Sequence, residues 1–238
     1  EDLRFAAQNG VRAIYCESYP FWAWCGPMHY VASRLQWDVN TGVDKVLAEL
    51  HEHCFGEVAP QMTAFHAACE QYWTRERPGR WFEGLDSLPP EEAMADIALL
   101  REAERHFEQA VTMAKDPTVR QRLDWLKRGF DFTMAIAGAF EINHDSREAP
   151  DRLEQLIRAA NRVESAHALL GELPGYNHTY YRPEPRFDRK CWRWFKDPVL
   201  DAAQARRVQM QEEDGSGEWP EVASDIGLTE LLERRGWE

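Results

Sequence analysis

The sequence predicts a mainly α-helical chain in which the terminal βα unit of a (β/α)8 barrel is followed by an antiparallel helical bundle. Apolar residues recur at helical spacing through most of the chain, which is the first observation behind this fold class. The second is that only residues 11–18 have the alternating pattern of a buried strand. The third is that long helices joined by short connections favour up-and-down packing.

The first nine residues are typical of the end of a helix, and Gly10 is suited to stop it. The strand predicted over 11–18 follows directly. A single strand cannot satisfy its own backbone hydrogen-bonding groups, so we expect its partner strands in sequence that is missing here. Because a helix, a glycine and a short apolar strand form the repeating unit of a parallel barrel, we expect the chain to begin inside the last part of one.

Two helices are predicted after an aromatic loop over 19–30, completing a first region over 1–77. Thr41 is expected to cap the first of them, and Gly56 to end it. The apolar face of this helix is predicted at Val43, Val46, Leu47, Leu50 and Cys54. The second helix starts near Pro60 and is expected to bury Met62, Phe65, Cys69 and Tyr72 or Trp73. The composition of residues 78–90 indicates a linker and a domain boundary.

Three long helices are predicted to form an antiparallel bundle over 89–173. The second of these helices should begin with Asp116 as N-cap and Pro117 in the first helical position. It shows two apolar faces, one of them at Trp125, Phe132 and Ile136, so we expect it to pack between neighbours. The other face and the stripes of the flanking helices give the expected core: Ala93, Ile97, Leu100, Phe107, Ala110, Ala114, Val119, Leu123, Leu126, Phe130, Ala137, Phe140, Leu153, Leu156, Ala160, Val163, His167 and Leu170.

The remaining residues, 174–238, are expected to pack on the helices as an irregular aromatic segment and an acidic tail. The irregular part covers 174–198 and is basic and rich in tryptophan. Arginines stacked on tryptophans while the segment packs over the bundle are the favoured interpretation. A ligand platform or a strip for single-stranded nucleic acid is the alternative. A short helix is predicted around 228–235.

Composition limits the possible partners. With 28 Lys and Arg against 41 Asp and Glu, the formal net charge of −13 argues against nucleic acid and anionic membranes. No apolar run approaches the ~20 residues of a membrane span. The cysteines lack the C-x-x-C spacing of zinc sites and form no disulfide framework, so we expect mostly buried free thiols at Cys16, Cys25, Cys54, Cys69 and Cys191. No phosphate-binding loop occurs, and we expect neither a metal nor a cofactor.

The end of the predicted strand carries the best candidate site. Barrel enzymes place their chemistry at the C-terminal ends of strands, where this chain has Glu17. The rings that follow could stack on the apolar face of a pyranose while Glu17 bonds hydroxyls or acts as an acid or base. The alternative is that the rings plug the barrel mouth. The predicted catalytic residue is Glu17, and the predicted substrate-binding residues are Tyr19, Trp22, Trp24, His29 and Tyr30.

The sequence His51-Glu-His53-Cys54 resembles a metal motif but has the wrong spacing. Residues two apart on a helix point about 200° apart, so His51 and His53 cannot share one ion. We therefore interpret 51–54 as a solvated helix face. His167, on an apolar stripe, is expected to be a hydrogen-bonded core histidine.

Several short motifs occur together between Gly10 and Trp73. They are Gly10-Val11-Arg12 before the strand ending in Glu17, the stretch from Tyr30 to Leu35, Trp37-Asp38, Val43-Asp44, Phe55-Gly56 and Ala59-Pro60. In these features the chain resembles the domain of unknown function 4838, found in glycoside hydrolase family 163. It departs from the family at Val39, where a proline is expected, and in a Cys- and Trp-rich insertion around 21–25.

The resemblance implies a (β/α)8 barrel running into a helical region, with retaining endo-β-N-acetylglucosaminidase activity on complex N-glycans. It also implies an extracellular or periplasmic location and a glycan as partner, together with the upstream barrel portion of the same protein. The main catalytic acids would lie on earlier strands outside this sequence, so this piece alone is not expected to catalyse. Two alternatives stay open: a non-catalytic helical module for glycan binding or assembly, and a glucuronidase-like barrel enzyme of other sugar specificity.

Overall fold

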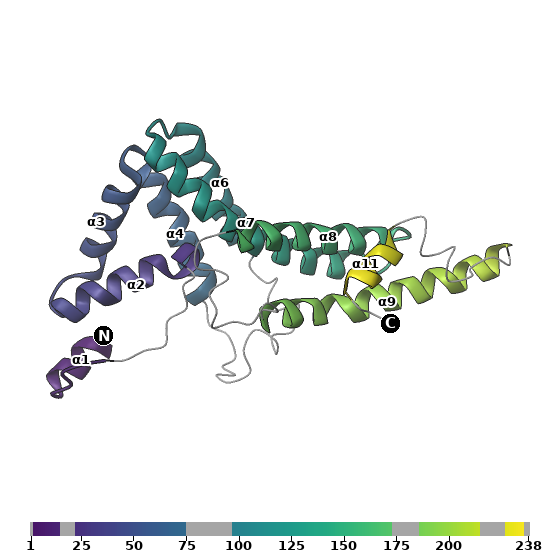
Figure 1. Cartoon of the computed structure of the whole chain (residues 1–238), viewed down its shortest axis with the longest axis horizontal. Coiled ribbons are helices and arrows are strands. Elements are labelled where there is room, and N and C mark those ends of the chain that lie inside the picture. The colour runs from purple at the N-terminus through teal and green to yellow at the C-terminus, as the bar shows by residue number, and fades with distance from the viewer. Residues whose placement is uncertain (1, 15–21, 75–96, 173–185, 215–226, 236–238) are drawn as a thin grey trace. The chain divides into compact units, whose positions relative to one another are not determined.

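The computed structural model describes residues 2–14, 22–74, 97–172, 186–214 and 227–235, and every regular element in these ranges is a helix (Figure 1). The mainly α-helical class is therefore confirmed. The helices are α1 (Asp2–Gln8), α2 (Trp22–Trp37), α3 (Val43–Phe55), the 3-10 turn η1 (Gly56–Val58), α4 (Ala59–Thr74), α6 (Ile97–Met113), α7 (Pro117–Asp145), α8 (Arg152–Gly171), α9 (Arg186–Asp214) and α11 (Leu228–Arg235). None of them combines the length and hydrophobicity of a membrane-spanning helix.

The described residues form two compact units. Unit 1 contains α1 to α4, α6 from Ala98 and α7 as far as Phe130. Unit 2 contains α7 from Asp131 together with α8, α9 and α11. The division therefore runs through α7, whereas the boundary predicted over 78–90 falls outside the described residues.

Helix α1 ends as the sequence predicts. Gly10 has φ +82°, a conformation that residues with a Cβ rarely adopt. The Gly10 N–H donates to the Ala7 carbonyl at 3.1 Å, and the Val11 N–H donates to the Ala6 carbonyl at 3.0 Å. These two bonds form the Schellman motif, in which a glycine at C′ satisfies the last carbonyls of a helix.

The segment after Gly10 was predicted as a strand over 11–18. Residues 11–14 are described and have no regular secondary structure, while 15–18 lie outside the described ranges. Val11 and Ile14 are 47 % and 42 % exposed. The predicted strand is therefore not present in the part of 11–18 that the structure describes.

The aromatic loop predicted over 19–30 is wrong from Trp22 onward, because α2 occupies Trp22–Trp37. Pro27 lies inside this helix, where proline lacks the N–H that a helix interior uses. Thr41 does not cap α3 as predicted: Gly42 is the N-cap and makes no side-chain cap bond. The Thr41 hydroxyl instead donates to Asp38 Oδ2 at 3.1 Å.

Helices α3 and α4 form a hairpin through η1, and Gly56, with φ +47°, ends α3 as predicted. Of the residues expected to face the core, Val46, Met62, Phe65 and Tyr72 are buried. Val43 is exposed instead, since it is the first residue of its helix. The Phe65 ring meets Phe107 of α6 and Phe130 of α7, each with 5.0 Å between centroids, so aromatic packing joins three helices in the core of unit 1.

Helix α7 begins with the predicted cap. The Thr118 N–H donates to Asp116 Oδ1 at 2.6 Å, directly before Pro117 at the first position. A side chain from η1 reinforces this start, since Glu57 Oε1 accepts from the N–H groups of Lys115 at 2.7 Å and Asp116 at 3.0 Å. Arg122 in turn donates to the His53 and Cys54 carbonyls at the end of α3.

We expect Asp116→Ala to lower the free energy of unfolding by about 1 kcal/mol, the usual effect of losing an N-cap side chain. The cause is the loss of the acceptor for the Thr118 N–H. Urea denaturation followed by circular dichroism measures the change. Asp124→Ala is the matched control, because exposed Asp124 makes only an i,i+4 pair with Arg128, typically a few tenths of a kcal/mol. Equal losses in both variants would contradict the capping role.

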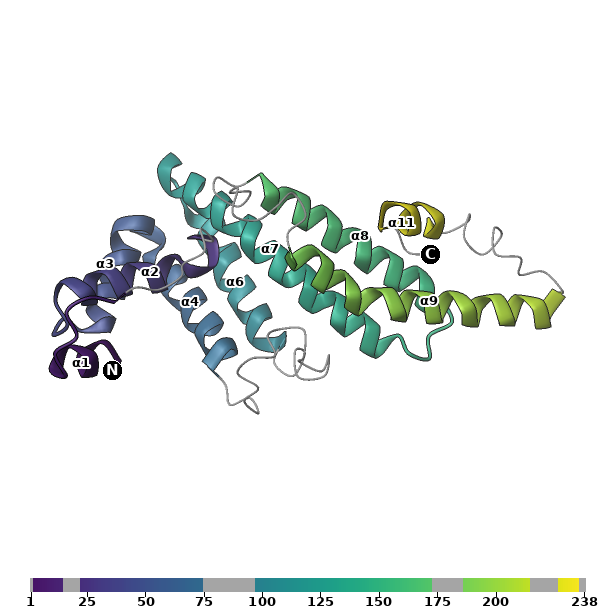
Figure 2. The same ribbon diagram turned by 60° about the horizontal axis from the view of Figure 1, so that its bottom comes forward.

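In the second half of α7, Phe132 of the second predicted face is buried, whereas Ile136 there and Trp125 nearer the start of the helix are half-buried. Phe132, Ala135 and Ala139 are buried as well as Ala137 and Phe140. After the short connection over 146–151, α8 turns back along this half of α7 within unit 2 (Figure 2). Helix α8 also contacts α9 and α11. The apolar stripe predicted for α8 is buried at Leu153, Leu156, Ala160 and Val163. The side chains of His167 and Leu170 are not among those that the structure describes.

The irregular segment predicted over 174–198 is wrong from residue 186 onward, because α9 runs from Arg186 to Asp214 with Pro198 inside it. Its buried residues Val199, Ala202 and Ala203 follow the i, i+3, i+4 spacing of a helix packed on one side. The short helix predicted around 228–235 is present as α11. Leu228 and Leu231 are fully buried, and Arg235 pairs with Glu164 of α8 at 2.6 Å.

Candidate functional site

Only some residues of the predicted sugar site are among those that the structure describes. Glu17 and Tyr19, with the neighbouring Ser18 and Phe21, lie outside the described residues. The other predicted site residues lie on α2: Trp22, Trp24, His29 and Tyr30. The side chains of the two tryptophans are not described, while His29 and Tyr30 are half-buried. The structure thus places the described part of the candidate site on a helix and not on a loop.

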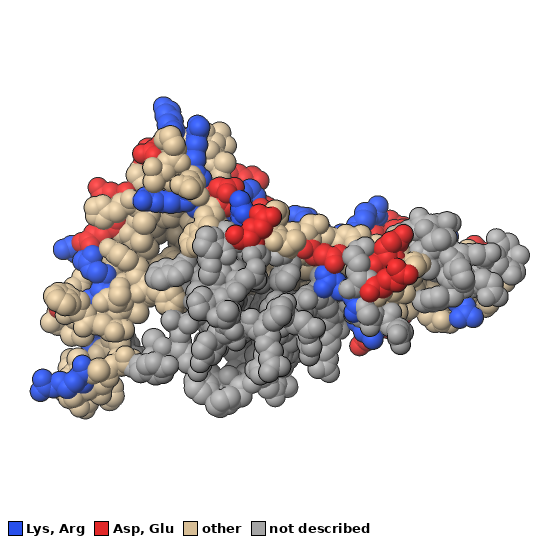
Figure 3. Space-filling view, in the orientation of Figure 1, with Lys and Arg blue, Asp and Glu red and all other residues tan. Residues whose placement is uncertain are grey.

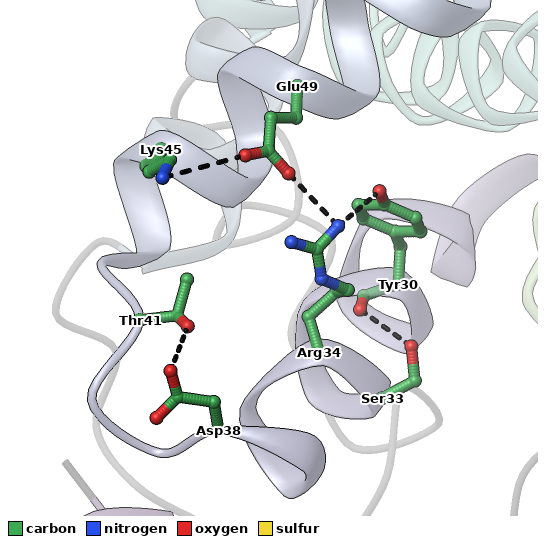
Figure 4. Close-up of polar contacts among 7 residues, drawn as sticks. All are labelled: Tyr30, Ser33, Arg34, Asp38, Thr41, Lys45 and Glu49. Atoms are coloured by element: carbon green, nitrogen blue, oxygen red, sulfur yellow. Dashed lines mark hydrogen bonds and ion pairs between the residues drawn. The ribbon is translucent and has the colours of Figure 1, made fainter.

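Tyr30 belongs to a polar cluster that joins α2 to α3 (Figure 4). Arg34 Nη1 donates to the Tyr30 hydroxyl at 3.0 Å and lies 3.0 Å from Glu49 Oε2. The guanidinium carbon is 5.8 Å from the centre of the Tyr30 ring, within the range of a cation–π contact. The bond to Tyr30 and the charge of Glu49 raise the pKa of Arg34. Lys45 lies 4.0 Å from the other oxygen of Glu49.

The turn between α2 and α3 is held by its own side chains and by α1. Asp38 accepts from the Asn40 N–H at 3.0 Å and from the Thr41 hydroxyl at 3.1 Å, and these bonds lower the pKa of the Asp38 carboxyl. Arg4 of α1 donates to the Val39 carbonyl at 2.8 Å. Trp37, the last residue of α2, is 92 % exposed beside this turn. An exposed indole on a fixed turn could stack on a ligand ring.

The chemistry available in this cluster is recognition. The Tyr30 hydroxyl accepts from Arg34, so its own hydrogen can still be donated. Glu49 is the counter-ion of Arg34. On the face shown in Figure 3, acidic and basic side chains are interspersed over the described residues.

Sequence reasoning missed a second polar group, inside the α3–α4 hairpin. The solvated face predicted over 51–54 is wrong for His51, which is only 4 % exposed. Glu52 and His53 are exposed as expected. His51 Nε2 lies 3.0 Å from Nδ1 of His66, and the two rings stack with 5.0 Å between centroids. The sequence does contain one indication that His51 is buried. It lies four residues before Phe55, and residues four apart lie on the same face of a helix.

The partners of the two rings determine where their hydrogens lie. The Thr63 hydroxyl donates its single hydrogen to the Ala59 carbonyl at 2.9 Å, because a carbonyl can only accept. Its oxygen therefore accepts from His51 Nδ1–H at 2.9 Å. His51 Nε2 is then an acceptor, and His66 Nδ1–H donates to it. Both imidazoles are neutral in this arrangement.

Burial disfavours the charged form of both rings. It lowers the pKa of His51, and together with the neighbouring His51 it lowers the pKa of His66 to about 4. A hydrogen bond to the Met62 carbonyl acts in the opposite direction on His66. The rings of Phe65 and Phe55 lie 4.9 and 6.3 Å from that of His66, which explains the apolar surroundings.

Two free cysteines lie on the same hairpin, Cys54 on α3 and Cys69 on α4, both half-buried. Burial raises the pKa of Cys69 to about 12, so its thiol stays protonated and unreactive at neutral pH. Within the described ranges, no three His, Cys, Asp or Glu side chains come close enough together to hold a metal ion.

Comparison with known proteins finds no matching family model, no matching curated protein and no matching solved structure. The resemblance to the domain of unknown function 4838 therefore rests on the motifs between Gly10 and Trp73.

Proposed function

We propose that this chain is the C-terminal part of a carbohydrate-active glycoside hydrolase. In this proposal α1 and the segment after Gly10 belong to the terminal βα unit of a (β/α)8 barrel, and the helices that follow support it. Resemblance to glycoside hydrolase family 163 suggests an endo-β-N-acetylglucosaminidase acting on complex N-glycans outside the cell or in the periplasm. Its partners would be the glycan and the upstream barrel portion of the same polypeptide.

The observation that carries this proposal is the uncovered apolar surface at the start of the chain. Ten large apolar side chains of the described residues are strongly exposed, and six of them fall within the first 43 residues: Phe5, Val11, Ile14, Met28, Trp37 and Val43. Helix α1 buries none of its described side chains, and Leu35 is the only buried one among the side chains of α2 that the structure describes. Further structure packed on this part of the chain would remove these side chains from water. A barrel sheet would pair the segment after Gly10 and cover both helices.

Glu17 would then stand at the C-terminal end of a barrel strand, where barrel enzymes hold their catalytic groups. A retaining glycosidase needs two carboxyl groups about 5–5.5 Å apart, or one carboxyl and the acetamide of the substrate. Glu17 would supply an acid or a hydroxyl-binding group, and the other acids would come from earlier strands. Tyr19 and the α2 residues Trp22, Trp24, His29 and Tyr30 would bind the sugar.

The test is the activity of the longer polypeptide that contains this chain, assayed by release of glycan from a complex-type N-glycopeptide. We expect Glu17→Gln to lower kcat/KM at least about 10²-fold, the low end of what an acid–base group contributes. Glu52→Gln, on an exposed face of α3, is the matched control and should leave kcat/KM unchanged. Wild-type activity in Glu17→Gln would remove Glu17 from the site, and absence of glycan hydrolysis by the wild-type polypeptide would overturn the proposed function.

A second candidate function is a non-catalytic module that binds glycans. The 92 % exposed indole of Trp37 favours it, since an exposed ring can stack on a pyranose. Binding of N-glycan oligosaccharides by this chain, without hydrolysis by the longer polypeptide, would select this function. Hydrolysis of glucuronoside substrates in place of N-glycans would select a glucuronidase-like enzyme.

A further inference from the structure

We infer that the α3–α4 hairpin is a pH-sensitive element, closed while His51 and His66 are both neutral and loosened when the pair takes up a proton. On the side toward η1, α3 and α4 are joined by a chain of hydrogen bonds that links the Ala59 carbonyl, the Thr63 hydroxyl, His51 and His66. This inference is independent of any activity on glycans.

An added proton would find the Met62 carbonyl as a polar acceptor beside His66, but no carboxylate. A proton on His51 Nε2 would face the N–H of His66 Nδ1 across 3.0 Å, replacing a hydrogen bond by a repulsion between two donors. A proton on the other nitrogen of His66 would place the charge in a ring that touches Phe65 and Phe55. Either position places an imidazolium beside apolar rings, in buried His51 or in half-buried His66, which is costly without an anionic partner.

The charged groups on the surrounding elements do not provide that partner. Glu52 and His53 on α3 and Glu70 on α4 are exposed. Glu57 of η1 binds the N–H groups at the start of α7, and Arg122 of α7 binds the end of α3. Glu49 of α3 pairs with Arg34 of α2. The pKa of His51 is lowered by burial, and the pKa of His66 is lowered by burial and by the neighbouring His51. No carboxylate of the described residues is among the groups that affect either pKa, so none stabilises the charged pair.

The hairpin connects the other parts of unit 1. Glu49 of α3 holds Arg34 of α2, next to Tyr30. Phe65 of α4 packs against α6 and α7. Loosening the contact between α3 and α4 therefore also weakens the contact between α3 and α2.

The direction of the pH effect follows from the lowered pKa. A histidine of the open hairpin titrates near its ordinary pKa of 6.5, whereas folded His66 titrates at about 4. The open state binds more protons between these values, so the closed state is fully favoured above pH 6.5 and loses stability as the pH falls toward 4. The carboxyls of Asp38 and Glu57 have pKa values lowered from 3.8 and 4.5, and their contributions fade only at lower pH. The interval from pH 7 to pH 5 therefore reports mainly on the histidines.

The experiment is hydrogen–deuterium exchange of the whole chain at pH 7 and pH 5, corrected for the pH dependence of chemical exchange. We expect the opening constant of α3 and α4 amides to rise at least roughly 20-fold at pH 5, which is the linkage effect of the His66 proton by itself. Amides of α8, in unit 2, serve as an internal reference and should change much less. Equal changes in α8 and in the hairpin would overturn the inference.

Two variants separate the pair from general acid effects. His66→Asn keeps an N–H donor near the position of Nδ1 but does not titrate, so the ratio of opening constants between pH 5 and pH 7 should fall well below the wild-type ratio. His53→Asn, the exposed control on α3, should keep the wild-type ratio. The ratio does not depend on any constant loss of stability caused by the substitution. An unchanged ratio in His66→Asn would overturn the inference.

A direct measurement covers the case in which His66→Asn fails to fold. Imidazole ¹⁵N chemical shifts of the wild-type chain distinguish the two neutral tautomers from the imidazolium. We expect both His51 and His66 to carry their hydrogen on Nδ1 at pH 7 and to remain neutral at pH 5.5. Titration of both rings near the ordinary pKa of 6.5 would overturn the inference.

Discussion

Replacing Phe65 by alanine is expected to lower the free energy of unfolding of unit 1 by ~3–5 kcal/mol, the range measured when a buried phenylalanine is truncated. Phe65 is 6 % exposed and meets Phe107 and Phe130 edge-on, with interplanar angles of 66° and 83°. The substitution removes apolar contact and both ring pairs, and leaves a cavity between three helices. Chemical denaturation, with hydrogen exchange to localise the loss to α4, α6 and α7, measures the effect.

Phe5→Ala is the matched control, since the same residue type is 68 % exposed on α1. We expect it to change the free energy of unfolding of this chain by less than ~0.5 kcal/mol, as is usual for surface positions. Similar losses in the two variants would show that Phe65 does not occupy the core position seen here. A loss in Phe65→Ala confined to α4 would contradict the packing of α4 against α6 and α7.

Leu156→Ala should have a comparable effect in unit 2, with an expected loss of ~2–5 kcal/mol. Leu156 is fully buried on α8, the helix that contacts both α9 and α11. Truncation removes buried apolar surface at a position where the neighbouring helices cannot collapse without moving. Hydrogen exchange of α8, α9 and α11 amides, read with the overall denaturation curve, measures the loss.

Leu169 offers the control for this substitution, because it lies on the same helix and is 48 % exposed. Leu169→Ala should stay within ~0.5 kcal/mol of the wild type. If it destabilised the chain as much as Leu156→Ala, the assignment of the buried face of α8 would be wrong.

The sequence was most informative where local rules act alone. The cap at Asp116, the first-turn Pro117 and the stop signals Gly10 and Gly56 all lie where the sequence predicts them. Most described residues of the apolar stripes predicted for α6, α7 and α8 are buried as well, whereas Ile97, Trp125 and Ile136 are half-buried. Caps and stripes depend on neighbours within a few residues, so one sequence contains the information they need.

Two helices were missed because their composition conflicts with local propensity. Helix α2 contains Pro27 and helix α9 contains Pro198, and proline inside a helix normally argues against it. In α9, the buried spacing of Val199, Ala202 and Ala203 was present in the sequence, but the prediction gave more weight to the aromatic and basic residues before it. Packing on α8 stabilises a helix that propensity alone disfavours.

The candidate sites differ in how far they could be anticipated. His29 and Tyr30 were selected for their residue types, but their place on a helix and the bond of Tyr30 to Arg34 required the structure. The pairing of His51 with His66 joins residues 15 positions apart on two helices, and its hydrogen pattern depends on Thr63. Contacts between side chains of two helices depend on how each helix is rotated about its axis. The apolar pattern of a single helix does not specify this rotation relative to its neighbour.

By itself, the sequence determined the helical class, most helix ends and the apolar faces of the long helices, since these follow from backbone hydrogen bonding and spacing along one helix. Only the tertiary structure decided which faces meet. It grouped α6 and the start of α7 with the first helices through Phe65, and it placed His51 in the interior. Contacts between helices depend on the combined shapes of distant side chains, so they are settled when the helices pack.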